Sequence, residues 1–200
     1  MKSLLYAVLI LLVMSQTVVK DDKSVVKELL ESKLDAVVAV LQKKELEQQA
    51  KNKKIIEIVT PMFDFPLMAK LSLGRKYWPG LSKDKQERFA ELFIKRLKES
   101  YREKLTLYTD EKIVYQAPVQ VKKKIRIQTE LVSKNNKISM LYKFHKSKRN
   151  WKIYDIEIEG VSIISTYRSQ FDEVLSSGTI DDLLLKLEKP EKEKPPLTTD

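Results

Sequence analysis

The sequence predicts an α+β fold, with a four-stranded antiparallel meander sheet and several helices packed on one face. Up to about residue 101 the apolar residues recur every three to four positions, which is typical of amphipathic helices. Between Ile113 and Ile158 they alternate with polar residues, which is typical of strands. From Val161 the helical spacing returns. Helices, then a meander, then helices favour a layer of helices over one face of the sheet.

The first half of the chain predicts four helices. Ser24 is a candidate N-cap for the first of them, and Ser82 is a candidate N-cap for the fourth. Pro66 suits the first position of the third helix, and Gly74 is expected to end it. The expected ranges are 24–41, 55–59, 66–74 and 82–101.

Four apolar runs predict the strands, at 113–121, 125–131, 138–144 and 151–158. Asn135-Asn136 and the cluster 147–150 are turn signals that separate consecutive runs. In the fourth run the apolar parity shifts, which predicts a bulge near Tyr154-Asp155. Gly160 is expected to end the sheet.

The last part of the chain predicts two helices. The first covers 161–175 and ends at Gly178. Thr179 is expected to cap a final helix that runs through Leu187. Residues 189–200 are rich in Pro, Lys and Glu and predict a disordered tail.

The N-terminus has the features of a secretory signal. Lys2 precedes an apolar run from Leu4 to Met14, which is too short to span a bilayer, and small or polar residues follow. We therefore expect a signal peptide at 1–15, with an uncleaved N-terminal anchor as the other interpretation, followed by a single domain at 22–188. The chain has no cysteine, so it can form no disulfide and no thiolate metal site.

The charge of the chain is unevenly distributed. The net charge is +10. Residues 101–153 hold 14 Lys/Arg and 4 Asp/Glu, a difference of +10, so the rest of the chain is balanced. Such a segment favours an anionic partner, or it provides the solvated faces and turns of a sheet. For an exported protein we expect no nucleic-acid partner.

Catalytic and metal-binding patterns are weak. His145 is the chain's one histidine, and its strand parity directs it away from the apolar face. The sequence offers no cluster of metal ligands and no glycine-rich phosphate loop. Asp155 and Glu157 fit outward-facing acids of a sheet or an acid pair in a cleft. The residues therefore predict no enzyme, no metal and no cofactor. The wide apolar faces fit either a lined cavity or a dense core.

Two blocks of sequence carry a resemblance to a known family. The first runs from Met62 to Trp78 and begins Met62-Phe63-Asp64-Phe65-Pro66. The second joins Trp151-Lys152-Ile153-Tyr154-Asp155, Glu159-Gly160-Val161-Ser162 and Tyr167-Arg168-Ser169-Gln170-Phe171. Their order and spacing resemble the MlaC family, periplasmic phospholipid carriers also called toluene-tolerance auxiliary proteins. The resemblance covers about Met62 to Leu187, and the tail lies outside the family pattern.

The resemblance implies a non-enzymatic periplasmic protein that needs no cofactor. Such a protein would shuttle phospholipid between the outer membrane and an inner-membrane ABC transporter, which maintains the lipid asymmetry of the outer membrane. The implied partners are a phospholipid ligand, an inner-membrane MCE-domain protein of the transporter and an outer-membrane lipoprotein complex. A carrier that docks alternately on two partners is expected to be a monomer.

The resemblance also implies an apolar cavity between sheet and helices that holds acyl chains and leaves the headgroup outside. Lys76 and Arg168 are candidates for its mouth, with a solvated charge as the other interpretation. Lys122, Lys123 and Lys124 are candidates for headgroup binding or docking. The candidate lining residues are Phe89, Phe93, Leu97, Tyr101, Ile138, Met140, Tyr142, Phe144, Trp151, Ile153, Ile156, Ile158, Ile164, Tyr167 and Phe171.

Two other functions stay open on the sequence. The first is a non-enzymatic interaction module with a filled core, which would use a basic sheet surface to bind an acidic partner or a membrane. The second is a hydrolase on an NTF2-like or cystatin-like sheet, which would need a catalytic set that the sequence does not show.

Overall fold

The computed structural model describes residues 21–102, 112–133 and 137–189, and it has the predicted α+β class. The predicted signal peptide and most of the predicted tail lie outside these residues. The helices of this part are α1 (Asp22–Leu41), α2 (Gln48–Val59), α3 (Phe65–Tyr77), α4 (Lys83–Arg102), α5 (Ile163–Ser177) and α6 (Ile180–Glu188), with 3-10 turns η1 (Thr60–Met62) and η2 (Trp78–Gly80). The strands are β1 (Lys112–Tyr115), β2 (Val119–Val121), β3 (Lys124–Val132), β4 (Lys137–Ser147), β5 (Asn150–Ile158) and β6 (Val161–Ser162).

The sheet is antiparallel and has six strands in its described part, so the predicted number of four is wrong. Their order is β1-β3-β4-β5-β6, and β2 also pairs with β3. The first predicted run is divided between β1 and β2, which pair with opposite ends of β3. Pro118 lies at this break and has no N–H to donate to a neighbouring strand.

Gly160 does not end the sheet. Glu159 (φ 50°) and Gly160 (φ 78°) both lie in the left-handed region and form a tight turn. The chain then returns as β6, which pairs with the end of β5. Both residues have the positive φ that the commonest two-residue hairpin turns require.

The predicted bulge at Tyr154-Asp155 is confirmed. Lys143 pairs with Asp155 whereas the next residue, Phe144, pairs with Ile153, so Tyr154 is the extra residue. The bulge keeps Ile153 and Ile156 on the same face of the sheet, although they are three positions apart.

The helix boundaries that differ from the prediction include the start of α1 and the end of α3. The N-cap of α1 is Asp21 and not Ser24, because the Asp21 carboxylate accepts the Ser24 N–H at 2.9 Å. Gly74 interrupts α3 with φ 78° and ψ 176°, but helical residues continue to Tyr77. At the other end of the chain, Thr179 caps α6 as predicted and forms a capping box with Asp182.

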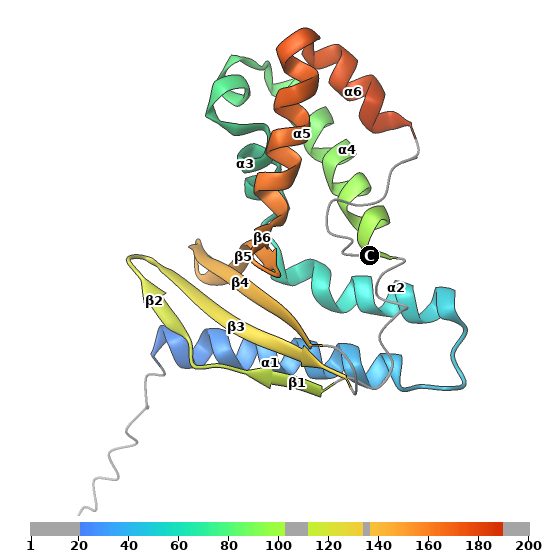
Figure 1. Cartoon of the computed structure of the whole chain (residues 1–200), viewed down its shortest axis with the longest axis vertical. Helices are drawn as coiled ribbons and strands as arrows, with labels where there is room; N and C mark the ends of the chain where they lie inside the picture. The colour runs from blue at the N-terminus through green and yellow to red at the C-terminus, as the bar shows by residue number, and fades with distance from the viewer. Residues whose placement is uncertain (1–20, 103–111, 134–136, 190–200) are drawn as a thin grey trace, which may run out of the picture.

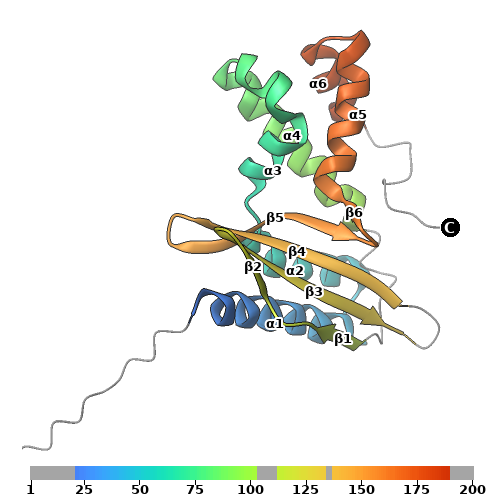
Figure 2. The ribbon, with the colours of Figure 1, turned by 60° about the vertical axis from the view of Figure 1, so that its left-hand side comes forward.

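The helices form two groups around the sheet. Figures 1 and 2 show α1 running along β3 and β1, with α2 beside it, whereas α3, α4, α5 and α6 gather beyond the β5–β6 side. One apolar core joins the two groups, from Leu30 of α1 through Ile127 and Phe144 of the sheet to Phe171 of α5. Within the described ranges, no helix combines the length and the apolar character needed to cross a membrane.

Candidate functional site

An apolar pocket lies where the sheet meets both helical groups. Its volume is about 210 Å³. Within the described part of the chain its lining is almost entirely apolar, and the polar exceptions are Thr60, Lys98 and the hydroxyl of Tyr142. The lining residues are Leu34, Val37, Ile55, Ile56, Val59, Thr60, Met62, Phe63, Phe65, Met68, Leu97, Lys98, Met140, Tyr142, Ile153, Ile156, Ile158 and Ile163.

Strands β4 and β5 form the floor of the pocket. Met140 pairs with Ile158, and Tyr142 pairs with Ile156, so these side chains stand in two adjacent rows on one face. Ile153 joins them because the bulge at Tyr154 resets the parity of β5. The inner face therefore presents a continuous apolar surface.

Helices α1 and α2 form one wall. Leu34 and Val37 lie one turn apart on α1, and Ile55, Ile56 and Val59 lie within little more than one turn of α2. Neighbours three and four positions apart share one face of a helix, which brings these side chains to the pocket. Ile56 and Val59 are half-buried, as expected for side chains beside an open space.

The segment from Thr60 to Met68 closes the pocket near β5. Phe63 makes a parallel bridge to Ile153, and the Asp64 N–H donates to the Ile153 carbonyl at 2.8 Å. The Asp64 carboxylate caps α3 by accepting the Leu67 N–H at 3.1 Å. The rings of Phe63 and Phe65 stack with centroids 5.4 Å apart. These bonds fix two aromatic rings at the pocket.

The single histidine supports this segment. His145 Nε2 lies 2.9 Å from Asp64 Oδ2, and its ring meets Tyr154 edge-on. The contact joins β4 to the N-terminus of α3. Because Asp64 already caps a helix, a structural role explains the pair fully. Across the described residues, no group of three or more His, Cys, Asp or Glu side chains could hold a metal ion.

The outer face of the sheet carries an ion cluster. Lys143 Nζ lies 2.9 Å from Asp155 Oδ2 and also contacts the Glu157 carboxylate. Asp155 accepts from Ser162 Oγ at 2.8 Å and from the Ile164 N–H at 3.2 Å, which ties β5 to the start of α5. Burial lowers the pKa of Lys143, but its bonds to Glu157 and Asp155 outweigh burial and leave the pKa above its usual value. Neither acid lines the pocket.

The predicted lining residues fall into three sets. Six of them line the pocket: Leu97, Met140, Tyr142, Ile153, Ile156 and Ile158. The side chain of Tyr101 lies outside the described residues. The others do not line the pocket: Phe89, Phe93, Ile138, Phe144, Trp151, Ile164, Tyr167 and Phe171.

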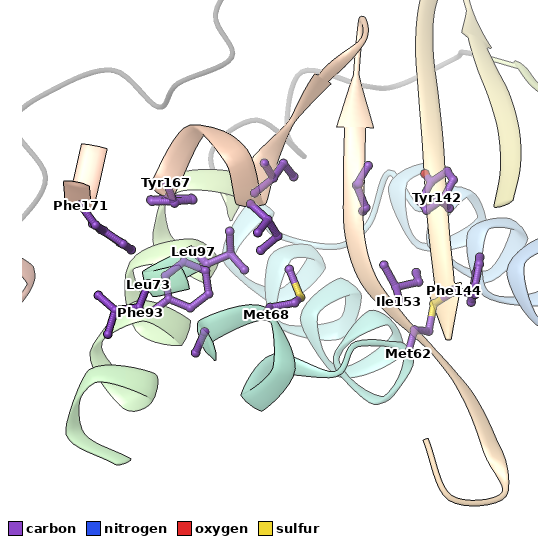
Figure 3. Close-up of a cluster of buried hydrophobic side chains, with 14 of the residues drawn as sticks. Met62, Met68, Leu73, Phe93, Leu97, Tyr142, Phe144, Ile153, Tyr167 and Phe171 are labelled. Atoms are coloured by element: carbon purple, nitrogen blue, oxygen red, sulfur yellow. The ribbon is translucent and has the colours of Figure 1, made fainter. Parts of the chain in front are cut away.

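Four of these form an aromatic cluster between α4 and α5. Phe93 meets Tyr167 edge-on at 5.2 Å, and Phe89 meets Phe171 edge-on at 5.4 Å between ring centroids. Figure 3 shows Phe93, Tyr167 and Phe171 at the helical end of the core, with Tyr142 and Phe144 at the sheet end. The cluster holds α4 to α5, and its rings are all buried.

The predicted mouth residues have partners within the protein. Arg168 donates from Nε and Nη2 to the Leu71 carbonyl at 2.9 and 2.6 Å. Lys76 pairs with Asp172 at 3.3 Å. Neither residue lines the pocket.

The three consecutive lysines lie at the turn between β2 and β3. Lys122, Lys123 and Lys124 are all exposed, and Lys122 has a φ of 57°. Lys124 Nζ lies 4.2 Å from the centroid of the Tyr154 ring. This turn is separate from the pocket lining.

Sequence reasoning missed the walls from α1, α2 and residues 60–68. The periodicity of α1 and α2 signals burial, but it does not show what each face is buried against. The Phe63-Asp64-Phe65-Pro66 motif was a signal that could have found the third wall, because two aromatic residues flank a capping acid there.

Comparison with known proteins gave consistent matches. The family model described as MlaC protein matches residues 31–189. A curated relative from Haemophilus influenzae, the intermembrane phospholipid transport system binding protein MlaC, is 24% identical over 119 residues. That alignment covers 56% of this chain and 56% of the relative, so the chain matches about half of the relative's length.

A solved structure shares the fold. It is that of a phospholipid-binding protein from Ralstonia solanacearum in complex with a phospholipid, with a TM-score of 0.71 and 21% sequence identity. The match covers 80% of this chain and 93% of that chain.

Proposed function

The chain belongs to the MlaC family, and we propose that it binds phospholipid in the apolar pocket and carries it in the periplasm. The carrier moves phospholipid between the outer membrane and an inner-membrane ABC transporter and thereby maintains outer-membrane lipid asymmetry. It forms no covalent intermediate and needs no cofactor. The observation that supports this most strongly is the pocket itself, where an apolar lining carries a single charged side chain among the described residues.

The energetics of lipid transfer explain why such a pocket suffices. Each methylene exposed to water costs about 0.8 kcal/mol, so a chain of about 14 methylenes costs about 11 kcal/mol. A dry pocket offsets this cost without hydrogen bonds to the chain. Met62, Met68 and Met140 contribute unbranched, adaptable side chains, which suits acyl chains of mixed shape.

The interaction-module interpretation is less well supported. It requires a core that its own side chains fill, whereas the rows of β4 and β5 face an open volume. The basic turn at Lys122, Lys123 and Lys124 serves the carrier equally well, as a docking surface for its membrane partners. We propose an inner-membrane MCE-domain protein and an outer-membrane lipoprotein complex as these partners.

The direct test is uptake of phospholipid from vesicles by wild-type protein and pocket variants. Met140→Asp places a carboxylate in the apolar floor, and Ile56→Asp places one in the α2 wall. Each is expected to weaken lipid binding by about tenfold or more, because an unpaired charge is costly in an apolar space. Val114→Asp is the matched control, since Val114 lies on the sheet and is 47% exposed.

The two groups of variants give opposite expectations. Val114→Asp should take up lipid as the wild type does, and circular dichroism should show that all three variants keep their fold. Folded Met140→Asp and Ile56→Asp proteins that take up as much lipid as the wild type would rule out this pocket as the lipid site.

A further inference from the structure

One charged side chain reaches the pocket within the described residues. Lys98 lies near the C-terminal end of α4, directly after Leu97, and both line the pocket. Its side chain is half-buried. Its ammonium lies 5.2 Å from the centroid of the Phe65 ring, which also lines the pocket. The ammonium therefore lies beside an aromatic ring that lines the apolar pocket.

Lys98 has no carboxylate partner among the described residues. Its neighbours at three and four positions along the helix are Ile94, Lys95, Tyr101 and Arg102, and none is acidic. Glu99 is adjacent in sequence and projects from a different side of the helix. The ammonium lies over the face of the Phe65 ring, and this cation–π contact stabilises its charge only in part.

Three other lysines of the protein pair with carboxylates. Lys143 contacts two carboxylates, Lys146 pairs with Asp22 at 3.1 Å and Lys85 pairs with Asp181 at 2.7 Å. The ammonium of a half-buried lysine, with three donors and no described anionic partner, is a ready site for an anionic oxygen. Its position beside an apolar pocket fits an anion attached to acyl chains.

We propose that Lys98 binds the phosphate of the phospholipid whose acyl chains fill the pocket, an inference that rests on the proposed function. The phosphate is common to all diacylglycerophospholipids, whereas the alcohol beyond it varies. Lys98 therefore anchors the phospholipid through the lipid phosphate and does not select among headgroup alcohols. A fatty-acid carboxylate offers the same anionic oxygen chemistry.

The test measures dissociation constants by fluorescence titration with acyl-labelled lipids that share the same chain. The lipids are phosphatidylglycerol, diacylglycerol, which lacks the phosphate, and the free fatty acid. The proteins are wild type, Lys98→Gln, Lys98→Arg and Lys95→Gln. Lys95 is an exposed lysine one turn earlier on α4 and serves as the matched control.

Lys98→Gln is expected to weaken phosphatidylglycerol binding by about tenfold and to leave diacylglycerol binding unchanged, because only the charged contact is lost. Lys98→Arg keeps the charge and should stay within about twofold of wild type, as should Lys95→Gln. A loss confined to phosphatidylglycerol assigns the site to phosphate. An equal loss for the fatty acid assigns it to any acyl anion.

Two results would overturn the inference. Either Lys98→Gln binds phosphatidylglycerol as the wild type does, or it loses both phosphatidylglycerol and diacylglycerol equally, which would mean that the side chain only shapes the pocket. Failure of the proposed function looks different, since the wild type would then bind none of the three lipids.

Discussion

The carboxylate of Asp22 joins the start of α1 to the hairpin between β4 and β5. Its Oδ1 accepts the Trp151 indole N–H at 3.1 Å and lies 3.1 Å from Lys146 Nζ. The hydrogen bond from Trp151, followed by that from Lys146, holds the pKa of Asp22 below its usual value. These contacts connect segments more than a hundred residues apart, so they fix α1 against the sheet.

Stability should therefore depend on the charge of Asp22. A lowered folded-state pKa contributes stability above the unfolded pKa of about 3.9, and that contribution disappears as pH falls through the lowered value. We expect Asp22→Asn to lower the free energy of unfolding at pH 7, and the difference from wild type to vanish in strong acid. Urea unfolding followed by circular dichroism across this pH range measures it.

Asp84→Asn is the control for this prediction. Asp84 is also an acid in the first turn of a helix, but it makes no ion pair among the described residues. It should not show the same pH-dependent difference. If the difference in free energy of unfolding between wild type and Asp22→Asn persists unchanged in strong acid, the carboxylate charge is not the cause of that difference.

The sequence predicts which side chains share a buried face more reliably for strands than for helices. Met140, Tyr142 and Ile156 could be predicted to point inward together, because alternate residues of a strand share one face. Phe93 and Tyr167 could be predicted to be buried, but the two helices bury them against each other. An apolar stripe on a helix does not reveal whether it faces another helix or a cavity.

Helix α3 shows how one element depends on a single glycine. Gly74 has φ 78° and ψ 176°, a conformation that is open almost only to glycine. A Cβ at this position would lie 3.5 Å from Cδ and Nε of Arg168, whose guanidinium binds the Leu71 carbonyl of the same helix. The break in α3 and its tie to α5 therefore occur at one place.

Gly74→Ala is expected to lower the free energy of unfolding by about 1–3 kcal/mol, because alanine is strained in this backbone conformation. Chemical denaturation measures the change. Gly80→Ala is the control, since no atom lies within 4 Å of the added Cβ and its φ is not in the strained range. Equal stability of Gly74→Ala and wild type would contradict the conformation assigned to α3.

Most helices and strands could be predicted from the sequence. The period of two located the runs that contain β1 to β5, and the parity shift located the bulge at Tyr154. The division at Pro118 and the short β6 were missed, because a strand of two or three residues has no periodicity to detect. Helix α2 was predicted too short, because residues 48–54 are polar and contribute little to an apolar pattern.

Across the whole molecule, positive charge concentrates at one end of the sheet. The register pairs Lys124 with His145 and His145 with Lys152, so the β2–β3 and β4–β5 turns lie side by side. Asp22 engages one cation of this group, Lys146. The group consists of Lys122, Lys123, Lys124, Lys146, Lys148, Arg149 and Lys152.

Reversing Lys122, Lys123 and Lys124 to Glu is expected to slow lipid transfer to acceptor membranes that carry the partner proteins. The effect should be large at low salt and shrink as ionic strength rises, because the Debye length falls to about 8 Å at an ionic strength of 0.15 M. A variant with Lys83, Lys95 and Lys186 changed to Glu has the same net charge and is the control. Equal transfer rates for the two variants at low salt would remove the docking role of this turn.

Which segments meet at the pocket is a property of the whole molecule that local patterns do not contain. Leu34, Ile56 and Met140 lie far apart in the sequence, and only the path of the chain around the sheet brings them together. The family resemblance supplied the idea of a pocket between sheet and helices. It did not supply the walls from α1 and α2, because the matching motifs begin at Met62.

Native mass spectrometry of the protein purified from a bacterial periplasm shows whether the pocket holds phospholipid. Lipid extraction from the same sample identifies what is bound. We predict a near-stoichiometric complex whose added mass is that of a phospholipid. A protein that leaves the cell without lipid and also takes up no lipid from vesicles would show that the pocket is not a phospholipid site.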